Sequence, residues 1–273
     1  MTPAEVLRTH EQLHDVRGWL APVDAQVLAL MLGLQTSGGV SGDVLEVGVY
    51  EGRSAIFLAK LLEPEERLVV CDLFGSPAPN AVNRAENDAQ YGSLQRATFE
   101  ENCRRHLGDV PEVHQCPSGD LADRLAAGRF RLVHLDGSHS YEVVRSDIDL
   151  ARELLGHGGV VVFDDYRSAH TPGVAAAAWS AVVSGGLTAL CVTPSKLYAA
   201  VRRGDPSIAD VRAGLGALDV AVEDDEVAGQ PLLRVVPPAP AAGGTKSLVR
   251  SLTPPAVWRW AGVGAAAYRR RRA

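Results

Sequence analysis

The feature that most constrains the fold is a regular alternation of short apolar runs with longer amphipathic stretches between residues 44 and 164. The runs that predict strands are 44–50, 67–73, 112–116, 131–136 and 159–164, and the stretches that predict helices are 54–62, 93–107, 121–127 and 141–155. Because nearly every residue of these strands is apolar, both faces of the sheet must be covered. This pattern is typical of a parallel sheet between two layers of helices.

Two further apolar runs, 187–192 and 197–201, follow the alternation. Only residues 193–196 separate them, and a gap of hairpin length joins antiparallel strands. The sequence therefore predicts an α/β fold with a doubly wound, mostly parallel seven-stranded sheet whose last strand is antiparallel.

Three other segments flank this α/β domain, which occupies residues 39–203. Residues 1–38 predict an N-terminal helical cap, since a cap residue is followed by proline at the first helical position. Residues 204–236 form a less regular C-terminal extension. Residues 237–273 begin as a Pro/Gly linker and end as a basic tail that carries seven Lys or Arg side chains and no acidic ones.

Charge and composition narrow the classes of function. The first 245 residues carry 20 basic and 33 acidic side chains, which argues against a nucleic-acid substrate because phosphate binding needs a basic face. Four widely spaced cysteines without a CxxC pair indicate reduced thiols. The N-terminus lacks the apolar core of a signal peptide, and no apolar run is long enough to span a membrane. We expect a cytoplasmic protein.

The loop after the first strand has the residues of a cofactor site. Gly48 allows the backbone to approach a ligand closely, and Gly52 permits a tight turn into the next helix. The free N–H groups at that helix start suit a carboxylate, and Ser54 adds a hydroxyl donor. Glu46 is expected to face an ammonium group, so the loop suits an amino-acid zwitterion.

A dinucleotide-binding loop would have a different pattern. Its second glycine is replaced here by Tyr50, and an acid precedes its first glycine. We expect Tyr50 to line the cofactor site. A plain strand–turn–helix connection is the alternative interpretation of this loop.

Three residues at the ends of later strands are expected to complete the cofactor site. Asp72 ends the second strand, where an acid can accept two ribose hydroxyls, although it is also a reasonable strand-end cap. Ser118 follows the third strand and is placed near the adenine, with a helix cap as the alternative. Asp136 ends the fourth strand and is expected to reach the cofactor.

An acidic cluster is predicted where the fourth and fifth strands end. Asp136, Asp164 and Asp165 converge because the carboxyl ends of neighbouring parallel strands face one crevice. Three carboxylates in one cleft repel one another unless a cation neutralises them, and hard oxygen ligands favour Mg²⁺, or another divalent cation such as Mn²⁺ or Ca²⁺. The alternative is that Asp164 and Asp165 cap the loop that follows them.

Several histidines lie near this cluster. His139, three residues after Asp136, is the candidate general base at neutral pH, or else a capping or polar loop residue. His134 lies within the strand and is expected to be a hydrogen-bonded core residue. His170 is a candidate for substrate contact.

The motifs at 45–48, 135–142 and 158–166, with Thr171-Pro172-Gly173-Val174, resemble those of class I S-adenosylmethionine-dependent methyltransferases, whose sheet is Rossmann-like. Within that class the best match is the metal-dependent O-methyltransferases that act on macrolide sugars and related natural products. The resemblance covers roughly residues 40–200. It implies S-adenosylmethionine as cofactor, Mg²⁺ at the three aspartates and His139 as base. Other members have Asp-Gly-Asp in this loop and use an acid, so Ser138 leaves the base open.

The implied reaction transfers a methyl group to a hydroxyl of a small-molecule acceptor. A polar loop at 74–94 suits a sugar, and a catechol or other aromatic diol is the first alternative. A nicotinamide-dependent oxidoreductase and a non-catalytic scaffold are further alternatives. The N-terminal segment suits a substrate lid or a homo-oligomer contact. The tail at 247–273, with aromatic residues before four arginines, suggests peripheral contact with an anionic membrane or a partner.

Overall fold

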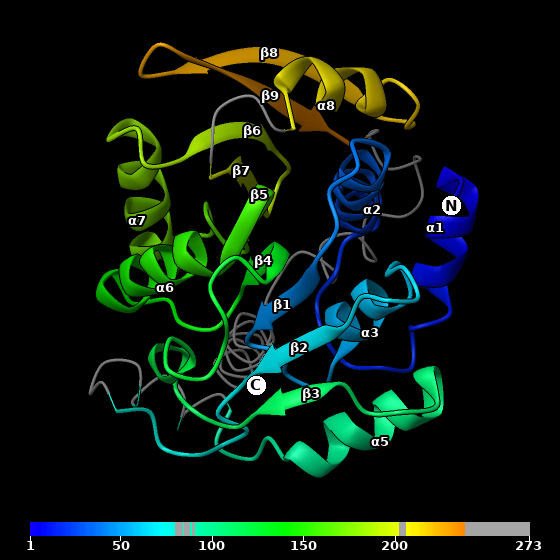
Figure 1. Ribbon diagram of the computed structural model, residues 1–273, viewed down its shortest axis with the longest axis vertical. Helices are drawn as coiled ribbons and strands as arrows, with labels where there is room; N and C mark the ends of the chain where they lie inside the picture. Colours follow the sequence, from blue (N-terminus) through cyan, green and yellow to red (C-terminus); the bar gives the residue numbers. More distant parts are fainter. Residues whose placement is uncertain (80–83, 85–87, 89–90, 202–205, 238–273) are drawn as a thin grey trace, which may run out of the picture. The chain divides into compact units, whose positions relative to one another are not determined.

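A nine-stranded sheet forms the centre of the computed structural model (Figure 1). The structure describes residues 1–79, 84, 88, 91–201 and 206–237. The sheet order is β3-β2-β1-β4-β5-β7-β6-β9-β8. The first five strands, which are parallel to one another, are β1 (Asp43–Val47), β2 (Leu68–Cys71), β3 (Glu112–His114), β4 (Phe130–Leu135) and β5 (Leu155–Phe163).

The predicted antiparallel pair is β6 (Thr188–Val192) and β7 (Leu197–Ala200). β7 lies between β5 and β6 and is antiparallel to both. The fold class predicted from the alternation is therefore confirmed. All five parallel strands end at one edge of the sheet, and the order reverses at β1 and β4, which places a ligand crevice at the carboxyl ends of these two strands.

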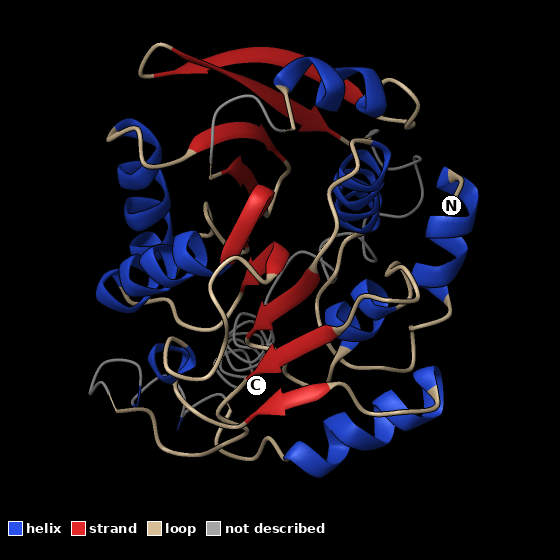
Figure 2. Ribbon diagram, in the orientation of Figure 1, coloured by secondary structure: helices blue, strands red, loops and turns tan. Residues whose placement is uncertain are grey.

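Helices cover both faces of the sheet (Figure 2). One apolar core lies between the sheet and the helices α2 (Pro22–Ser37), α3 (Arg53–Ala59), α5 (Arg96–Leu107) and α8 (Ile208–Leu215). A second core lies under α6 (Tyr141–Leu154) and α7 (Pro172–Val183). Alternate residues of each strand face opposite cores, as the period of two in a strand requires. Val44 and Val70, for example, belong to the first core, whereas Leu45 and Val69 belong to the second.

The N-terminal segment is helical, as predicted. The helix α1 (Pro3–Glu11) begins with a capping box in which the Thr2 hydroxyl accepts a hydrogen bond from the Glu5 N–H and the Glu5 carboxylate accepts one from the Thr2 N–H. α2 is buried along much of its length, and the Gln35 side chain donates hydrogen bonds to the backbone oxygens of Arg131 and Gly158.

The structure differs from the sequence prediction at two places. Residues 121–127, predicted as a helix, form only a turn after the short 3₁₀ helix η1 (Ser118–Leu121). The extension after residue 203 is more regular than expected. It forms a hairpin of β8 (Ala221–Val227) and β9 (Gln230–Val236) that lengthens the sheet beyond β6.

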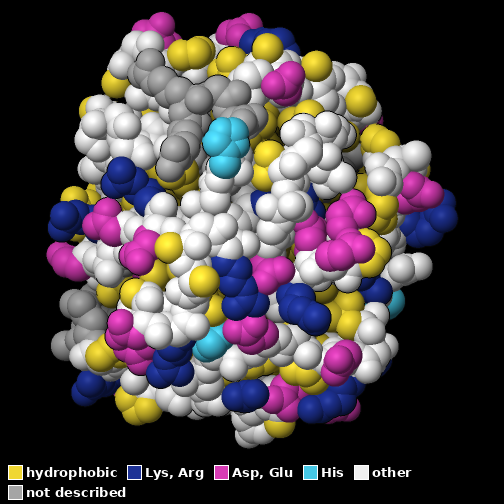
Figure 3. Space-filling view, in the orientation of Figure 1, with side chains coloured by type: hydrophobic (Ala, Val, Ile, Leu, Met, Phe, Trp, Pro, Cys, Tyr) yellow, Lys and Arg dark blue, Asp and Glu magenta, His cyan; other side chains and the backbone are white. Residues whose placement is uncertain are grey.

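The cysteines are unpaired thiols, and the surface carries charged side chains of both signs. All four cysteines are free and buried. On the face shown in Figure 3, Lys and Arg side chains are interspersed with Asp and Glu side chains. Within the residues described, no helix is both long and apolar enough to cross a membrane.

Candidate active site

The loop between β1 and α3 packs directly against the end of β4. Gly48 has a φ of +84°, and a Cβ at this position would lie 2.2 Å from the backbone oxygen of Asp136. Its N–H donates to the Cys71 oxygen at 2.8 Å. Gly52, with a φ of +100°, is the N-cap of α3 and lies against the Phe99 ring. Both glycines are therefore required by the backbone path that the sequence pattern predicted.

Asp72 holds this loop in place. One carboxylate oxygen accepts hydrogen bonds from the backbone N–H groups of Val49 and Tyr50 at 2.7 and 3.1 Å. The other accepts from the Phe74 N–H at 2.7 Å. Burial raises the pKa of Asp72, and these three hydrogen bonds oppose the rise. The Asp72 carboxylate thus holds the predicted cofactor loop by binding the backbone of that loop. The contact of Asp72 with a ribose stays a prediction.

Glu46 and Ser54 lie at the two ends of the loop and are buried. Glu46 Oε1 lies 2.7 Å from His134 Nδ1, and Glu46 Oε2 is buried without a hydrogen-bond partner among the residues described. His134 is the hydrogen-bonded core residue that the sequence predicted. The unpartnered oxygen of Glu46 leaves one acceptor for the predicted ammonium group.

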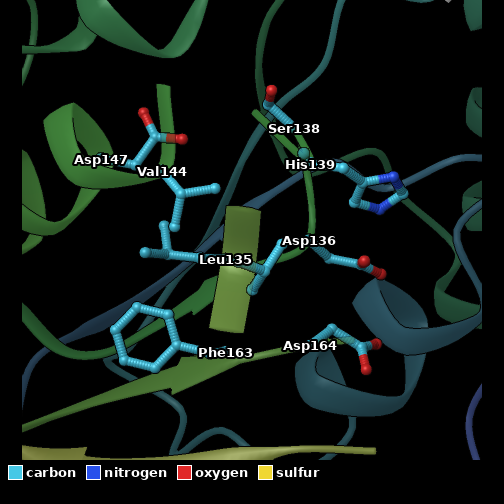
Figure 4. Close-up of a pocket in the computed structure, with 10 residues that line it drawn as sticks. Leu135, Asp136, Ser138, His139, Val144, Asp147, Phe163 and Asp164 are labelled. Carbon is cyan, nitrogen blue, oxygen red and sulfur yellow. The ribbon is translucent and has the colours of Figure 1, made fainter. Parts of the chain in front are cut away.

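Asp136 and Asp164 lie near each other at the strand ends, and a lysine lies with them. Asp136 and Asp164 extend their carboxylates in the same direction from neighbouring strand ends (Figure 4). The Lys196 ammonium, from the β6–β7 hairpin, forms an ion pair with Asp164 Oδ2 and lies 3.0 Å from His134 Nε2. Lys196 is 1% exposed. The sequence interpretation missed this residue.

The pKa values of Asp164 and Asp136 are shifted in opposite directions. Burial disfavours the ionised form of Asp164, but Lys196 and then His134 hold its pKa below the ordinary value. Burial, and next the charge of Asp164, raise the pKa of Asp136 well above its ordinary value. The pKa of Lys196 is raised because Asp164, Asp24 and Asp136 together outweigh its burial. The cluster therefore holds a charged pair beside a carboxyl that favours its neutral form.

The predicted metal set does not fit this arrangement. Among the described residues, no group of three or more His, Cys, Asp and Glu side chains is placed to hold a metal ion. Asp164 uses Oδ2 for Lys196 and accepts the Asp165 N–H on Oδ1 at 2.8 Å. Asp165 accepts the Ser168 hydroxyl at 2.6 Å, so the two acids partly serve as the loop caps that were the alternative interpretation. Carboxylate crowding suggested Mg²⁺, and in this structure the Lys196 ammonium is paired with Asp164.

His139 lies beside Asp165. Its Nε2 is 3.7 Å from Asp165 Oδ2, and its ring packs edge-on against His170 with 5.8 Å between ring centroids. Asp165 has a left-handed backbone with a φ of +54°, and its backbone oxygen accepts the Thr171 hydroxyl at 2.6 Å. The candidate base is thus placed next to a carboxylate that can stabilise its protonated form.

Ser118 begins the short helix η1, and its position near the adenine stays a prediction. Its hydroxyl donates to Asp147 Oδ1 of α6 at 2.6 Å, so its polar atom faces a buried acid. Asp147 lines a small cavity with Leu135, Val144 and Phe163. Figure 4 shows Asp147 on the side of this cavity opposite to Asp136, Asp164 and His139. The helix-cap alternative is wrong, because Pro117 is the N-cap residue of η1 and the Ser118 hydroxyl donates to α6. No local sequence signal links residues 29 positions apart.

Asp147 predicts a measurable pH dependence of stability. Burial raises its pKa from 3.8 to about 6, which the Ser118 hydrogen bond opposes. The unfolded chain therefore loses this proton at lower pH than the folded chain does, and ionisation of Asp147 destabilises the fold above pH 6. We expect Asp147→Asn, which keeps the Ser118 hydrogen bond, to raise the free energy of unfolding at pH 8 by about 2–3 kcal/mol.

This gain should shrink below pH 6 and vanish near pH 4, as measured by urea unfolding at each pH. Asp149→Asn, an exposed acid on the same helix, is the matched control and should show little pH-dependent difference. A gain of equal size at pH 4 and pH 8 would contradict the buried ionisation of Asp147.

An aromatic cluster that the sequence interpretation missed adjoins the cofactor loop. The Tyr50 ring lies 5.3 Å from the Trp19 ring and 6.1 Å from the Tyr91 ring, centroid to centroid. The Arg17 guanidinium lies 5.7 Å from the Tyr50 centroid. Tyr50 has a φ of +51° and Trp19 is 37% exposed. Trp19 of the N-terminal cap, Tyr50 of the cofactor loop and Tyr91 thus form one aromatic surface.

The order of the first seven strands, with an antiparallel β7 between β5 and β6, defines the fold of class I S-adenosylmethionine-dependent methyltransferases. The family model for a methyltransferase domain matches residues 45–166, which run from the cofactor loop to the end of the acidic cluster. Over those residues, which make up less than half of the chain, the sequence is similar to a methyltransferase domain.

Individual relatives are more distant. Over 142 residues the chain is 29% identical to the 8-demethyl-8-(2,3-dimethoxy-alpha-L-rhamnosyl)-tetracenomycin-C 4'-O-methyltransferase of Streptomyces olivaceus, a match that spans 47% of this chain and about half of that protein, 54%. The O-methyltransferase NovP has a similar structure, with 16% identity, a TM-score of 0.54, and 71% of this chain and 88% of NovP covered. Cofactor-bound Rv0187 from MTB has a TM-score of 0.48 at 23% identity, covering 73% and 88%. The structural likeness to NovP shows the fold alone.

Proposed function

We propose that this chain is an S-adenosylmethionine-dependent O-methyltransferase that methylates a hydroxyl of a sugar or a glycosylated natural product. The observation that carries the proposal is the direct contact between the two halves of the site. Gly48 of the cofactor loop packs against the backbone of Asp136, three residues before His139. A sulfonium methyl group bound at the loop and a hydroxyl at His139 would therefore lie in one crevice.

The reaction is an in-line displacement. The acceptor oxygen forms a bond to the methyl carbon as the carbon–sulfur bond breaks, and S-adenosylhomocysteine leaves as the neutral thioether. His139 takes the hydroxyl proton, and Asp165, 3.7 Å away, stabilises the resulting imidazolium. The chain's own residues account for each of these events, so no step of the proposal passes through a divalent cation.

Two observations support a sugar as the acceptor. The relative from Streptomyces olivaceus is named for methylation at a rhamnosyl-tetracenomycin. The exposed ring of Trp19, with Tyr50 and Tyr91, offers a rigid amphipathic surface beside the crevice, which suits a ring with one apolar face. Asn80, Asn83, Asn87 and Gln90, which are polar side chains of the 74–94 loop expected to suit a sugar, lie outside the described residues, as does the tail at 247–273.

His139 gives the test of the proposed mechanism. Substitution His139→Gln should lower kcat at neutral pH by about 10²- to 10⁴-fold, because the hydroxyl loses its base, while affinity for S-adenosylhomocysteine stays unchanged. Steady-state rates with methyl-labelled cofactor and a rhamnosylated polyketide measure the first effect, and calorimetry measures the second.

His14→Gln, at an exposed position in the turn after α1, is the control and should leave both quantities unchanged. A wild-type rate in His139→Gln would place the base elsewhere. Methylation of a catechol in preference to the glycoside would replace the sugar by an aromatic diol as the acceptor class.

A further inference from the structure

We propose that the buried ammonium of Lys196 takes the place of a divalent cation at the carboxylates of Asp136 and Asp164, so that methyl transfer by this chain needs no metal. Only the part that concerns methyl transfer rests on the proposed function. The occupation of the cation position by Lys196 stands on geometry alone.

Lys196 belongs to a continuous buried chain of polar groups. Glu46 Oε1 contacts His134 Nδ1 at 2.7 Å, and His134 Nε2 lies 3.0 Å from Lys196 Nζ, which pairs with Asp164 Oδ2. This series of polar contacts joins β1, β4, the β6–β7 hairpin and the loop after β5. It places the ammonium at the carboxyl ends of the two strands where the order of the sheet reverses.

Hydrogen bonds to α2 hold the hairpin that carries Lys196. The Lys196 N–H donates to the Thr193 hydroxyl oxygen at 2.9 Å, and that hydroxyl donates to Asp24 Oδ1 of α2 at 2.5 Å. Ser195 donates to the other oxygen of Asp24 at 2.6 Å. Asp24 and Thr193 are both buried. The backbone of Lys196 therefore cannot move out of the cluster without breaking buried hydrogen bonds, each of which is costly to leave unmade.

Both oxygens of Asp164 are engaged within the protein, and one of them carries the ion pair with Lys196. One oxygen binds Lys196 and the other accepts the Asp165 N–H. A divalent cation bound there would also meet the positive charge of the ammonium at close range in a site shielded from water. The opposite charge of Lys196 already removes the repulsion between the carboxylates that would otherwise call for a metal.

Lys196 is therefore a positioning residue, since its ammonium contacts the side chains of Asp164 and His134. By fixing Asp164 it fixes the next residue, Asp165, and with it the carboxylate beside His139. An arginine at position 196 keeps the charge, whereas a methionine removes the charge and leaves the length of the side chain nearly unchanged.

The test is a titration of the full-length protein with Mn²⁺, followed by electron paramagnetic resonance, in the presence and absence of S-adenosylhomocysteine. Wild type and Lys196→Arg should bind no Mn²⁺ at this site. Lys196→Met should gain affinity by at least about tenfold, because it frees the carboxylates, and the double variant with Asp164→Asn should lose that gain. Wild-type methyl transfer should survive chelator treatment.

One Mn²⁺ bound tightly by wild type and lost in Asp164→Asn would overturn the proposal. So would chelator-abolished activity that Mg²⁺ restores, or a folded Lys196→Met without Mn²⁺ affinity. If Lys196→Met does not fold, the wild-type titration and the chelator result decide. Failure to bind S-adenosylhomocysteine would instead refute the proposed function, and the Mn²⁺ titration would still decide the role of Lys196.

Discussion

Substitution Gly48→Ala is expected to weaken binding of S-adenosylhomocysteine by at least about 100-fold. The new Cβ would stand 2.2 Å from the Asp136 oxygen and 2.7 Å from the Gly137 Cα, both of them backbone atoms. Neither can move away as the end of a flexible side chain could. A non-glycine residue in the left-handed region adds about 1–3 kcal/mol of strain, and each 1.4 kcal/mol corresponds to about tenfold in affinity.

Calorimetric titration with S-adenosylhomocysteine measures this loss, and thermal unfolding shows whether the variant is folded. Gly229→Ala is the matched control. Gly229 has a φ of +76°, close to that of Gly48, but a Cβ there would meet no atom within 4 Å. The control should therefore show the backbone strain without the loss of cofactor binding. Equal cofactor affinity in Gly48→Ala and wild type would show that the β1–α3 loop is not the cofactor site.

Substitution Arg131→Met is expected to lower the free energy of unfolding by about 3–5 kcal/mol, because it leaves a buried carboxylate without its partner. Arg131 and Glu66 are paired at 2.5 Å with side chains that are 1% and 5% exposed. The same guanidinium donates to the Leu32 oxygen and the Thr36 hydroxyl at 3.1 and 2.9 Å. It thus joins α2 to the central strands of the sheet.

Urea unfolding of three variants separates the pair from its parts. Arg131→Met combined with Glu66→Met should cost less than Arg131→Met alone, since no charge is then left buried. Arg212→Met removes an exposed pair with Asp224 and should change stability by no more than about 1 kcal/mol. Equal losses in Arg131→Met and Arg212→Met would mean that burial does not decide the strength of these ion pairs.

Local patterns predicted the parts of this molecule that depend on neighbouring residues in the sequence. Apolar runs gave the strands, the gap at 193–196 gave the antiparallel pair, and Glu46, Gly48 and Gly52 marked the loop. The convergence of Asp136 and Asp164 followed from the rule that parallel strands end at one edge of a sheet. Each of these inferences needs only spacing and the known geometry of a sheet.

The sequence could not predict contacts between residues far apart in the chain. Lys196 lies in a hairpin whose pattern predicts only a turn, and its pairing with Asp164 depends on β7 entering the sheet beside β5. The hydrogen bond of Ser118 to Asp147 at 2.6 Å likewise depends on where α6 packs, which the local sequence does not show. The β8–β9 hairpin was missed because residues 223–226 are four consecutive acids, which suit an exposed edge strand and show no alternation.

The central claim is that the crevice at β1 and β4 binds S-adenosylmethionine and delivers its methyl group to a sugar hydroxyl. The most direct measurement incubates the full-length protein with methyl-labelled S-adenosylmethionine and a rhamnosylated polyketide, and identifies the labelled atom by mass spectrometry. We predict label on a sugar hydroxyl of the acceptor, and none on it with Gly48→Ala. Binding of NAD without affinity for S-adenosylmethionine, or label on carbon or nitrogen of the acceptor, would contradict the account.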